Sequence, residues 1–102
     1  MYSMKEACTL TNMTYENLKF YCNEGLVPNV KRDHNNRRVF DEKDVKWIKD
    51  LTCLKKCGMS IQEMKKYLEL CLQGEATIVS RKKMLARKQE ELRASIKELE
   101  DS

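Results

Sequence analysis

The chain has 102 residues, enough for one small domain with at most a short extension. Charged residues make up 35% and hydrophobic residues 41% of the sequence, which suits a soluble, helix-rich protein, and three glycines with one proline argue against a long all-β architecture. The net charge of +4 is too small to indicate a nucleic-acid partner by itself, so that argument must rest on where the charges lie.

Cysteine usage and the N-terminal residues predict the compartment. The five cysteines are odd in number and lack paired spacing, which argues against a secreted disulfide framework. The first residues lack the apolar core of a signal peptide, and no run approaches the roughly 18 apolar residues of a membrane helix. We therefore expect a cytoplasmic protein with reduced thiols and no membrane partner.

Two short helices are predicted at the start of the chain. Ser3 followed by Glu6 is a capping-box pattern, which opens the first helix. Asn12 tolerates the positive φ of a tight turn, and Thr14 can cap a second helix that ends at Gly25. Two short helices joined by a turn of about three residues predict a helix-turn-helix.

A small β-hairpin is predicted next. Val30 and residues 39–40 are short strand candidates, and the Asx-rich residues 33–36 between them suit a hairpin turn. A run of positive charge is usually just a solvated turn. A basic hairpin directly after a helix-turn-helix, however, is at the position of a wing, whose cations can neutralise DNA phosphates. The basic residues of this wing are Lys31, Arg32, Arg37 and Arg38.

Two longer helices are predicted after the wing. Asp41 with Asp44 is expected to cap the third helix, which ends at Gly58. A second capping box opens the fourth helix at Ser60, and this helix ends at Gly74.

The rest of the chain, residues 75–102, lacks Gly and Pro and is predicted to be one long helix. An isolated helix with one apolar seam has nowhere to bury it, so we expect pairing with a second copy. Packing onto the domain could instead absorb its first turn or two. A coil of about 24 residues spans about 36 Å, close to one turn of DNA. We therefore predict a DNA-binding domain over residues 1–74 and a dimerisation helix over residues 75–102. The seam follows a heptad with one additional partner: Ile78, Leu85, Leu92, Ile96 and Leu99.

Four motifs together resemble the MerR family of bacterial transcription regulators. They are YSMKEA from residue 2, TYENLKFY from residue 14, GLVP from residue 25 and NNRRVF from residue 35. The resemblance covers about the first 75 residues, and the closing helix fits the family's antiparallel dimer coil. It implies a mainly α fold in which a winged helix-turn-helix precedes a long C-terminal helix. It also implies a homodimer that binds a promoter palindrome in double-stranded DNA, distorts its spacer and works with RNA polymerase.

The resemblance assigns roles to individual residues. Lys19 and Tyr21 take positions that meet the phosphate backbone, whereas Tyr15 and Glu16 take positions that face base edges. The sequence departs from the family pattern at four positions: Lys19 replaces an arginine, Phe20 replaces a tyrosine, Arg37 stands where an aromatic residue is usual, and Asn12 replaces the turn glycine. A second wing is implied around the start of the fourth helix. The predicted DNA-binding set is Thr14, Tyr15, Glu16, Lys19, Tyr21, Arg32, Arg37, Arg38, Lys55, Lys56 and Ser60.

The segment WIKDLTCLKKCGMS, from residue 47, resembles the aldehyde- and thiol-stress-sensing branch of the family. That resemblance implies that Cys53 is a sensor. Lysines flank it, and neighbouring positive charge favours the reactive thiolate form of an exposed cysteine. Cys8, Cys22 and Cys71 are instead expected to be small core residues.

Two alternatives remain open from the sequence. The chain could be a protein–protein interaction module in which the coil is the active part. It could also be a soft-metal-binding regulator that uses Cys53 and Cys57, which lie one helical turn apart. Two thiols without a nearby histidine make a poor metal site, so neither a metal nor another cofactor is predicted. No nucleophile–base pair or phosphate-binding glycine loop is present in the sequence, so an enzyme is not expected.

Overall fold

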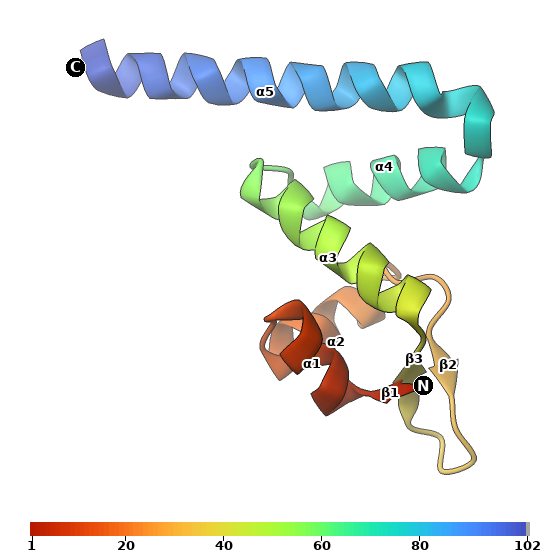
Figure 1. Cartoon of the computed structure of the whole chain (residues 1–102). Coiled ribbons are helices and arrows are strands. Elements are labelled where there is room, and N and C mark those ends of the chain that lie inside the picture. Colours follow the sequence, from red (N-terminus) through yellow and green to blue (C-terminus); the bar gives the residue numbers. More distant parts are fainter. Residues whose placement is uncertain (102) are drawn as a thin grey trace. The chain divides into compact units, whose positions relative to one another are not determined.

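The computed structural model describes residues 1–101, which form mostly helices (Figure 1). The chain divides into two compact units, Met1–Thr52 and Cys53–Ser102. The first contains β1 (Tyr2–Ser3), α1 (Met4–Thr11), α2 (Tyr15–Asn23), β2 (Lys31–Arg32), β3 (Arg38–Phe40) and most of α3 (Glu42–Lys56). The second contains the end of α3, then α4 (Ile61–Leu72), the 3-10 helix η1 (Gly74–Thr77) and α5 (Ile78–Asp101). The predicted mainly α fold with a small sheet and a long closing helix is confirmed.

The first two helices begin at the predicted caps. Ser3 Oγ accepts a hydrogen bond from the Glu6 amide at 3.2 Å, and the Ser3 amide donates to the Glu6 carboxylate at 3.1 Å. Thr14 Oγ1 accepts from the Asn17 amide at 3.2 Å. Between the helices, Asn12 has a φ of 55°, which makes the sharp turn of the helix-turn-helix.

An apolar core holds the helices of the first unit together. Trp47 ties α3 to the segment after α2, because its Nε1 donates to the Leu26 carbonyl at 2.6 Å. Fully burying one large apolar side chain contributes about 1.5–3 kcal/mol, so this core supplies most of the unit's stability. The fully buried apolar side chains of the unit come from α1, α2, the segment after it, β3 and α3: Ala7, Leu18, Leu26, Phe40, Ile48 and Leu51.

The wing is an antiparallel sheet of three strands in the order β1-β3-β2 (Figure 1). Val39 of β3 is opposite Ser3 of β1 on one side and Lys31 of β2 on the other. The first hairpin strand, predicted at Val30, lies instead at Lys31–Arg32, and β1 was not predicted. β1 has two residues and owes its extended pairing to β3, which is distant in the chain, so no local pattern marks it.

Asp33 shapes the tip of the hairpin. Its Oδ1 accepts hydrogen bonds from the amides of Asn35 at 2.9 Å and Arg37 at 3.0 Å. Asn36 has a φ of 61°, in line with the predicted Asx-rich turn. The hydrogen bond from the Arg37 amide is the main reason why the pKa of the Asp33 carboxyl is lowered, and the bond from the Asn35 amide adds to it. Both stabilise the charged form of the carboxyl group.

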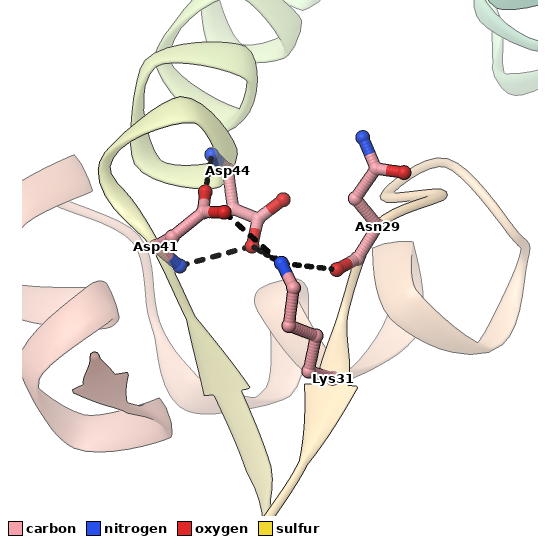
Figure 2. A network of polar contacts seen from close by, with 4 residues as sticks. All are labelled: Asn29, Lys31, Asp41 and Asp44. Atoms are coloured by element: carbon pink, nitrogen blue, oxygen red, sulfur yellow. Dashed lines mark hydrogen bonds and ion pairs between the residues drawn. The ribbon is translucent and has the colours of Figure 1, made fainter.

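A polar network ties the base of the wing to the start of α3 (Figure 2). The Asp41 amide donates to Asp44 Oδ2 at 3.0 Å and the Asp44 amide donates to Asp41 Oδ1 at 2.8 Å, so the predicted cap is confirmed as a reciprocal one. Lys31 Nζ lies 3.0 Å from Asp41 Oδ2 and 3.9 Å from Asp44 Oδ2, and it donates to the Asn29 carbonyl at 3.3 Å. Its hydrogen bond to Asp41 raises the pKa of Lys31.

In the second unit, α4 begins at the predicted capping box. The Glu63 amide donates to Ser60 Oγ at 3.1 Å, and the Ser60 amide donates to the Glu63 carboxylate at 3.0 Å. Gly58, which ends α3, has a φ of 88°, a conformation that favours glycine. Both predicted helix limits are therefore confirmed.

The turn between α4 and α5 differs from the prediction. Residues 75–77, expected to be α-helical, belong to η1. Thr77 explains this tighter turn, because its buried hydroxyl donates to the carbonyls of Leu70 and Gly74. Such hydroxyl bonds to backbone oxygens compete with regular helical hydrogen bonding. α5 therefore starts at Ile78.

α5 packs along α4 with one stripe of polar and apolar side chains. Arg81 donates to the Gly74 carbonyl at 3.2 Å and lies 3.7 Å from Cys71 Sγ. Lys88 Nζ forms an ion pair with Glu63 of α4 at 3.0 Å. Packing of the first turns of this helix was expected as an alternative, but the part played by Arg81 and Lys88 was not predicted, because cations in a sequence look like a solvated face. Among the described residues, no helix is both long and apolar enough to cross a membrane.

The heptad seam lies beside this stripe on the same side of α5, and most of it is open. Leu85 is half-buried, whereas the exposed fraction is 39% for Ile78, 43% for Leu92, 49% for Ile96 and 77% for Leu99. No residue of α5 is fully buried. The fold of one chain therefore leaves the predicted seam accessible.

Replacing Lys31 with Met should lower the melting temperature by about 1–4 °C at neutral pH, because it removes an exposed ion pair at the base of the wing. The pKa of Asp41 lies below its ordinary value of 3.8, so its contribution is complete well above that pH and is lost as the pH falls through the folded value. The pKa of Lys31 lies above its ordinary 10.5, so its contribution is lost as the pH rises through the folded value.

The difference between wild type and Lys31→Met should therefore be constant near neutrality and shrink at both extremes. Circular-dichroism melts from about pH 2 to pH 11 measure it. Lys46→Met, which removes an exposed charge from the second turn of α3, is the control. A Lys31 difference that does not change with pH would contradict the assigned ion pair.

Candidate nucleic-acid interface

One face of α2 is exposed and carries the side chains predicted to read DNA. Thr14, Tyr15, Glu16 and Lys19 are all exposed, whereas Leu18 on the other face is fully buried. The phenol ring of Tyr15 has an exposed fraction of 56%. Spacing of one and four residues places these side chains on neighbouring positions of one helical face. α2 can therefore present a phenol, a carboxylate and an ammonium group to one ligand surface.

Tyr21 has a different environment from the other residues of the predicted set. Its residue surface is 2% exposed, so its ring belongs to the core. Burial raises the pKa of the Tyr21 hydroxyl, which keeps it protonated at neutral pH and able to donate a hydrogen bond. A phosphate contact from Tyr21 is thus limited to this hydroxyl group. The neighbouring Phe20 is 45% exposed and offers no such donor.

Two wing arginines are oriented by neutral partners. Arg38 Nη2 donates to Asn23 Oδ1, at the end of α2, at 2.6 Å. Arg32 Nη1 donates to the Asn36 carbonyl, across the hairpin, at 3.0 Å. Because neither partner is charged, both guanidinium groups keep their full positive charge for an external anion. Asn23 was not predicted as a partner of Arg38, since nothing in the local pattern links two residues fifteen positions apart.

The remaining two basic residues of the wing differ sharply. The charge of Lys31 is balanced by Asp41 and by the buried carboxylate of Asp44 (Figure 2). Arg37 is exposed, and within residues 1–101 it forms no ion pair within 4 Å. The wing therefore uses one cation for its own structure and keeps three for a partner.

A hollow in the first unit brings the predicted residues of α2 and of the wing together. Tyr15 lines it from the start of α2, and Arg32, Arg37 and Arg38 line it from the wing. Ser3, Met4 and Lys5, from β1 and the start of α1, complete one wall. Arg37 therefore lies beside the predicted reading face, and Lys5 is an additional basic residue that the sequence analysis did not select.

The predicted second wing belongs to the other compact unit. Lys55 and Lys56 are exposed in the last turn of α3, where positive charge also interacts favourably with the helix dipole. Ser60 Oγ is occupied by the cap of α4. The structure thus supplies a local role for each of these three residues, and their contact with DNA stays a prediction.

All five cysteines are free thiols, and they differ in exposure. Cys53 is exposed, whereas the other four are half-buried; the expectation that Cys8, Cys22 and Cys71 are core residues was therefore too strong. Burial raises the pKa of the Cys8 and Cys22 thiols, which favours their less reactive protonated form. Across the described residues, no three or more His, Cys, Asp or Glu side chains gather as a metal site.

The sequence matches the model of the MerR HTH family regulatory proteins over residues 2–71 and that of the MerR DNA-binding segment over residues 45–102. The chain belongs to the MerR family. It is 35% identical over 98 residues to an uncharacterised HTH-type transcriptional regulator of Haemophilus influenzae, with 96% of this chain and 73% of that protein aligned. It is 36% identical over 80 residues to the HTH-type transcriptional regulator AdhR of Bacillus subtilis, with 78% of this chain and 57% of AdhR aligned.

The solved structures include a MerR protein on DNA. The crystal structure of HiNmlR, a MerR family regulator lacking the sensor domain and bound to promoter DNA, superposes with a TM-score of 0.81 at 34% identity. The alignment covers 98% of this chain and 79% of HiNmlR. The predicted winged helix-turn-helix with a long C-terminal helix is therefore confirmed. This MerR protein is a DNA-binding transcription regulator and not an enzyme.

Replacing Arg38 with Ala should weaken binding to specific and random duplexes alike, by about 5–10-fold, because a phosphate contact carries no sequence information. The slope of log affinity against log salt concentration should decrease in magnitude by about one unit for each bound protomer. Fluorescence anisotropy across a salt series measures both quantities.

Lys46→Ala is the matched control, since it removes one exposed positive charge from α3 of the same unit, outside the predicted DNA contacts. We expect its salt slope to stay close to that of wild type. An unchanged slope for Arg38→Ala would exclude Arg38 from the interface.

Proposed function

We propose that this MerR protein binds a palindromic promoter as a homodimer and distorts the spacer between the promoter elements. The observation that carries the proposal is the placement of Tyr15 and three wing arginines around one hollow, beside the exposed face of α2. Bases are read by side chains in the major groove, and phosphates are bound by cations beside it. The first unit offers both kinds of group on one surface.

The proposed DNA contacts divide by chemistry. Glu16 can accept from the exocyclic amine of cytosine, and Tyr15 can reach a base edge or the adjacent sugar. The remaining groups are cations or hydrogen-bond donors suited to phosphate. They are Thr14, Lys19, Tyr21, Arg32, Arg37 and Arg38, together with Lys55, Lys56 and Ser60 of the second unit.

Homodimer formation is supported by the open seam of α5. Four of its five apolar residues are exposed, although Arg81 and Lys88 on the same side of α5 contact the segment of α4 and the turn after it. A second copy offers the same seam and would remove these side chains from water. In this proposal residues 1–74 bind DNA and residues 75–102 dimerise; the last of them, Ser102, lies outside the described residues.

The charge distribution of α5 favours an antiparallel pair. Residues 78–88 contain five basic residues and no acidic one, whereas residues 89–101 contain five acidic and two basic residues. Two such helices in opposite directions place the basic half of each against the acidic half of the other. A parallel pair would place like charges together, which is unfavourable.

The length of α5 matches the spacing of a palindrome. Its 24 residues correspond to about 36 Å, close to one helical turn of DNA. An antiparallel pair would hold two reading heads at opposite ends of the coil. Bending the spacer costs several kcal/mol, about 1–6 by elastic estimates, which the phosphate contacts must offset. RNA polymerase would then recognise the realigned promoter elements.

DNase footprinting on the region upstream of the protein's own gene tests the promoter proposal. We expect protection of an inverted repeat and enhanced cleavage in the distorted spacer. Equally weak binding to every duplex, with a shallow salt slope, would reject it and favour the alternative of a protein–protein module.

Cys53 is the proposed sensor of electrophile or thiol stress. Its support is its exposure near the end of α3, together with the resemblance of the surrounding segment to the stress-sensing branch. The helix places Cys57 one turn away, with its amide donating to the Cys53 carbonyl at 3.0 Å. Modification of Cys53 would change the packing of α3 and thereby the distortion of the promoter.

Leu92→Asp should convert the dimer to a monomer and reduce operator affinity by at least about 100-fold, because it places a charge in the seam and removes the second reading head. Analytical ultracentrifugation and anisotropy measure the two effects. Ala94→Asp, an exposed position on the opposite side of α5, is the control. A dimeric Leu92→Asp variant would contradict the proposed seam.

Cys53→Ala should leave operator affinity within about two-fold of wild type, because Cys53 is exposed and outside the proposed DNA contacts. The variant should lose the response of a promoter reporter to an aldehyde or to diamide. Cys57→Ala is the matched control and should keep that response. A persisting response in Cys53→Ala would place sensing at another residue.

A further inference from the structure

We propose that the hollow of the first unit binds one backbone phosphate of duplex DNA, with Lys5 of α1 as a phosphate ligand. This inference rests on the proposed DNA-binding role of the wing and extends the interface to α1. Lys5 is absent from the predicted contacts, and the motif that resembles the family does not assign it a role. The hollow, the charge balance around it and the helical position of Lys5 point to it independently.

Four of the residues that line the hollow are cations. Lys5 contributes from the start of α1, and the hairpin contributes the others: Arg32 from β2, Arg37 from the turn and Arg38 from β3. All of these lie in the unit Met1–Thr52, so the arrangement belongs to one compact body. Several cations that converge from separate elements repel each other, and a bound anion relieves that repulsion.

Acidic groups balance only part of this charge. Asp33 is the one carboxylate among the described residues that line the hollow; its negative charge interacts with Arg37, and its Oδ1 accepts hydrogen bonds from the amides of Asn35 and Arg37. Within residues 1–101, neither Lys5 nor Arg37 has an acidic partner within 4 Å. By contrast, Lys31 of the same hairpin has two acidic partners and does not line the hollow.

The position of Lys5 in its helix supports an external partner. Lys5 is the second residue of α1, where the helix dipole disfavours positive charge and acidic residues are preferred. The capping box of Ser3 and Glu6 is complete without it. Lys5 is also exposed, so burial of its stem does not explain its place. A residue that breaks a local rule without a compensating contact in its own chain is typical of a functional site.

A DNA phosphate fits this site better than a free anion. Tyr15, which lines the same hollow, begins the helix whose exposed face is proposed to meet the bases. A phosphate seated among Lys5, Arg37 and Arg38 would thus belong to the strand beside the groove that α2 enters. Phosphate contacts of this kind set the register of a recognition helix on the duplex.

The test compares the full-length wild type with Lys5→Ala on an operator duplex and on a random duplex across a salt series. We expect affinity to fall by about 3–10-fold on both duplexes and the salt slope to fall by about one unit per bound protomer. The melting temperature of the free variant should equal or exceed that of wild type, because an unfavourable charge leaves the helix start. Lys43→Ala, an exposed lysine of α3 outside the hollow, is the matched control.

A second arm identifies the ligand. Operator duplexes that carry one uncharged methylphosphonate linkage, moved along each half-site, should include a position that weakens wild type but has no further effect on Lys5→Ala. Added inorganic phosphate should compete no better than sulfate at equal ionic strength, since the site is matched to the duplex. An affinity and salt slope for Lys5→Ala equal to those of wild type would overturn the inference.

The outcomes also separate this inference from the proposed function. Wild type that fails to bind any operator would remove the proposed function itself. Wild type that binds, with Arg38→Ala weakened and Lys5→Ala unchanged, would retain the regulator and reject only the phosphate site at α1.

Discussion

The wing depends on an ion-pair network at its base. β1 and β2 have two residues each, too few backbone pairs to hold a hairpin against the helices by themselves. Lys31, Asp41 and Asp44 join the start of β2 to the first turn of α3, and Trp47 anchors α3 to the segment after α2. The arginines further along the hairpin take their positions from this base. One cation is thereby used for structure so that the others are placed for binding.

Helix limits could be predicted from the sequence because their causes are local. Ser3, Thr14 and Ser60 each bond an amide three residues away, and Asn12 sits in its turn without help from distant residues. β1 could not be predicted, since its pairing with β3 joins residues nearly forty positions apart. The part played by the cations of α5 in packing on α4 was also hidden, because cations that bond across an interface resemble a solvent-facing row.

In the candidate site, too, features with local causes could be predicted from the sequence, whereas contacts between distant residues could not. The residue types of the wing predicted a basic surface, but they could not show that Asp41 neutralises one lysine while neutral groups orient Arg32 and Arg38. The family resemblance assigns DNA contacts only to residues at certain motif positions. Lys5 is not one of them, so the resemblance did not predict its contact. A lysine in the first turn of a capped helix was the signal that could have marked it.

The open seam of α5 has a consequence for how steeply the regulator acts. If pairing through this seam is needed to place two reading heads, the active species forms by a second-order equilibrium. Where most chains are monomeric, doubling the protein concentration raises the dimer concentration about four-fold. Operator occupancy would then follow expression level more sharply than for a monomeric repressor. The strength of one apolar stripe would set the threshold concentration at which the promoter responds.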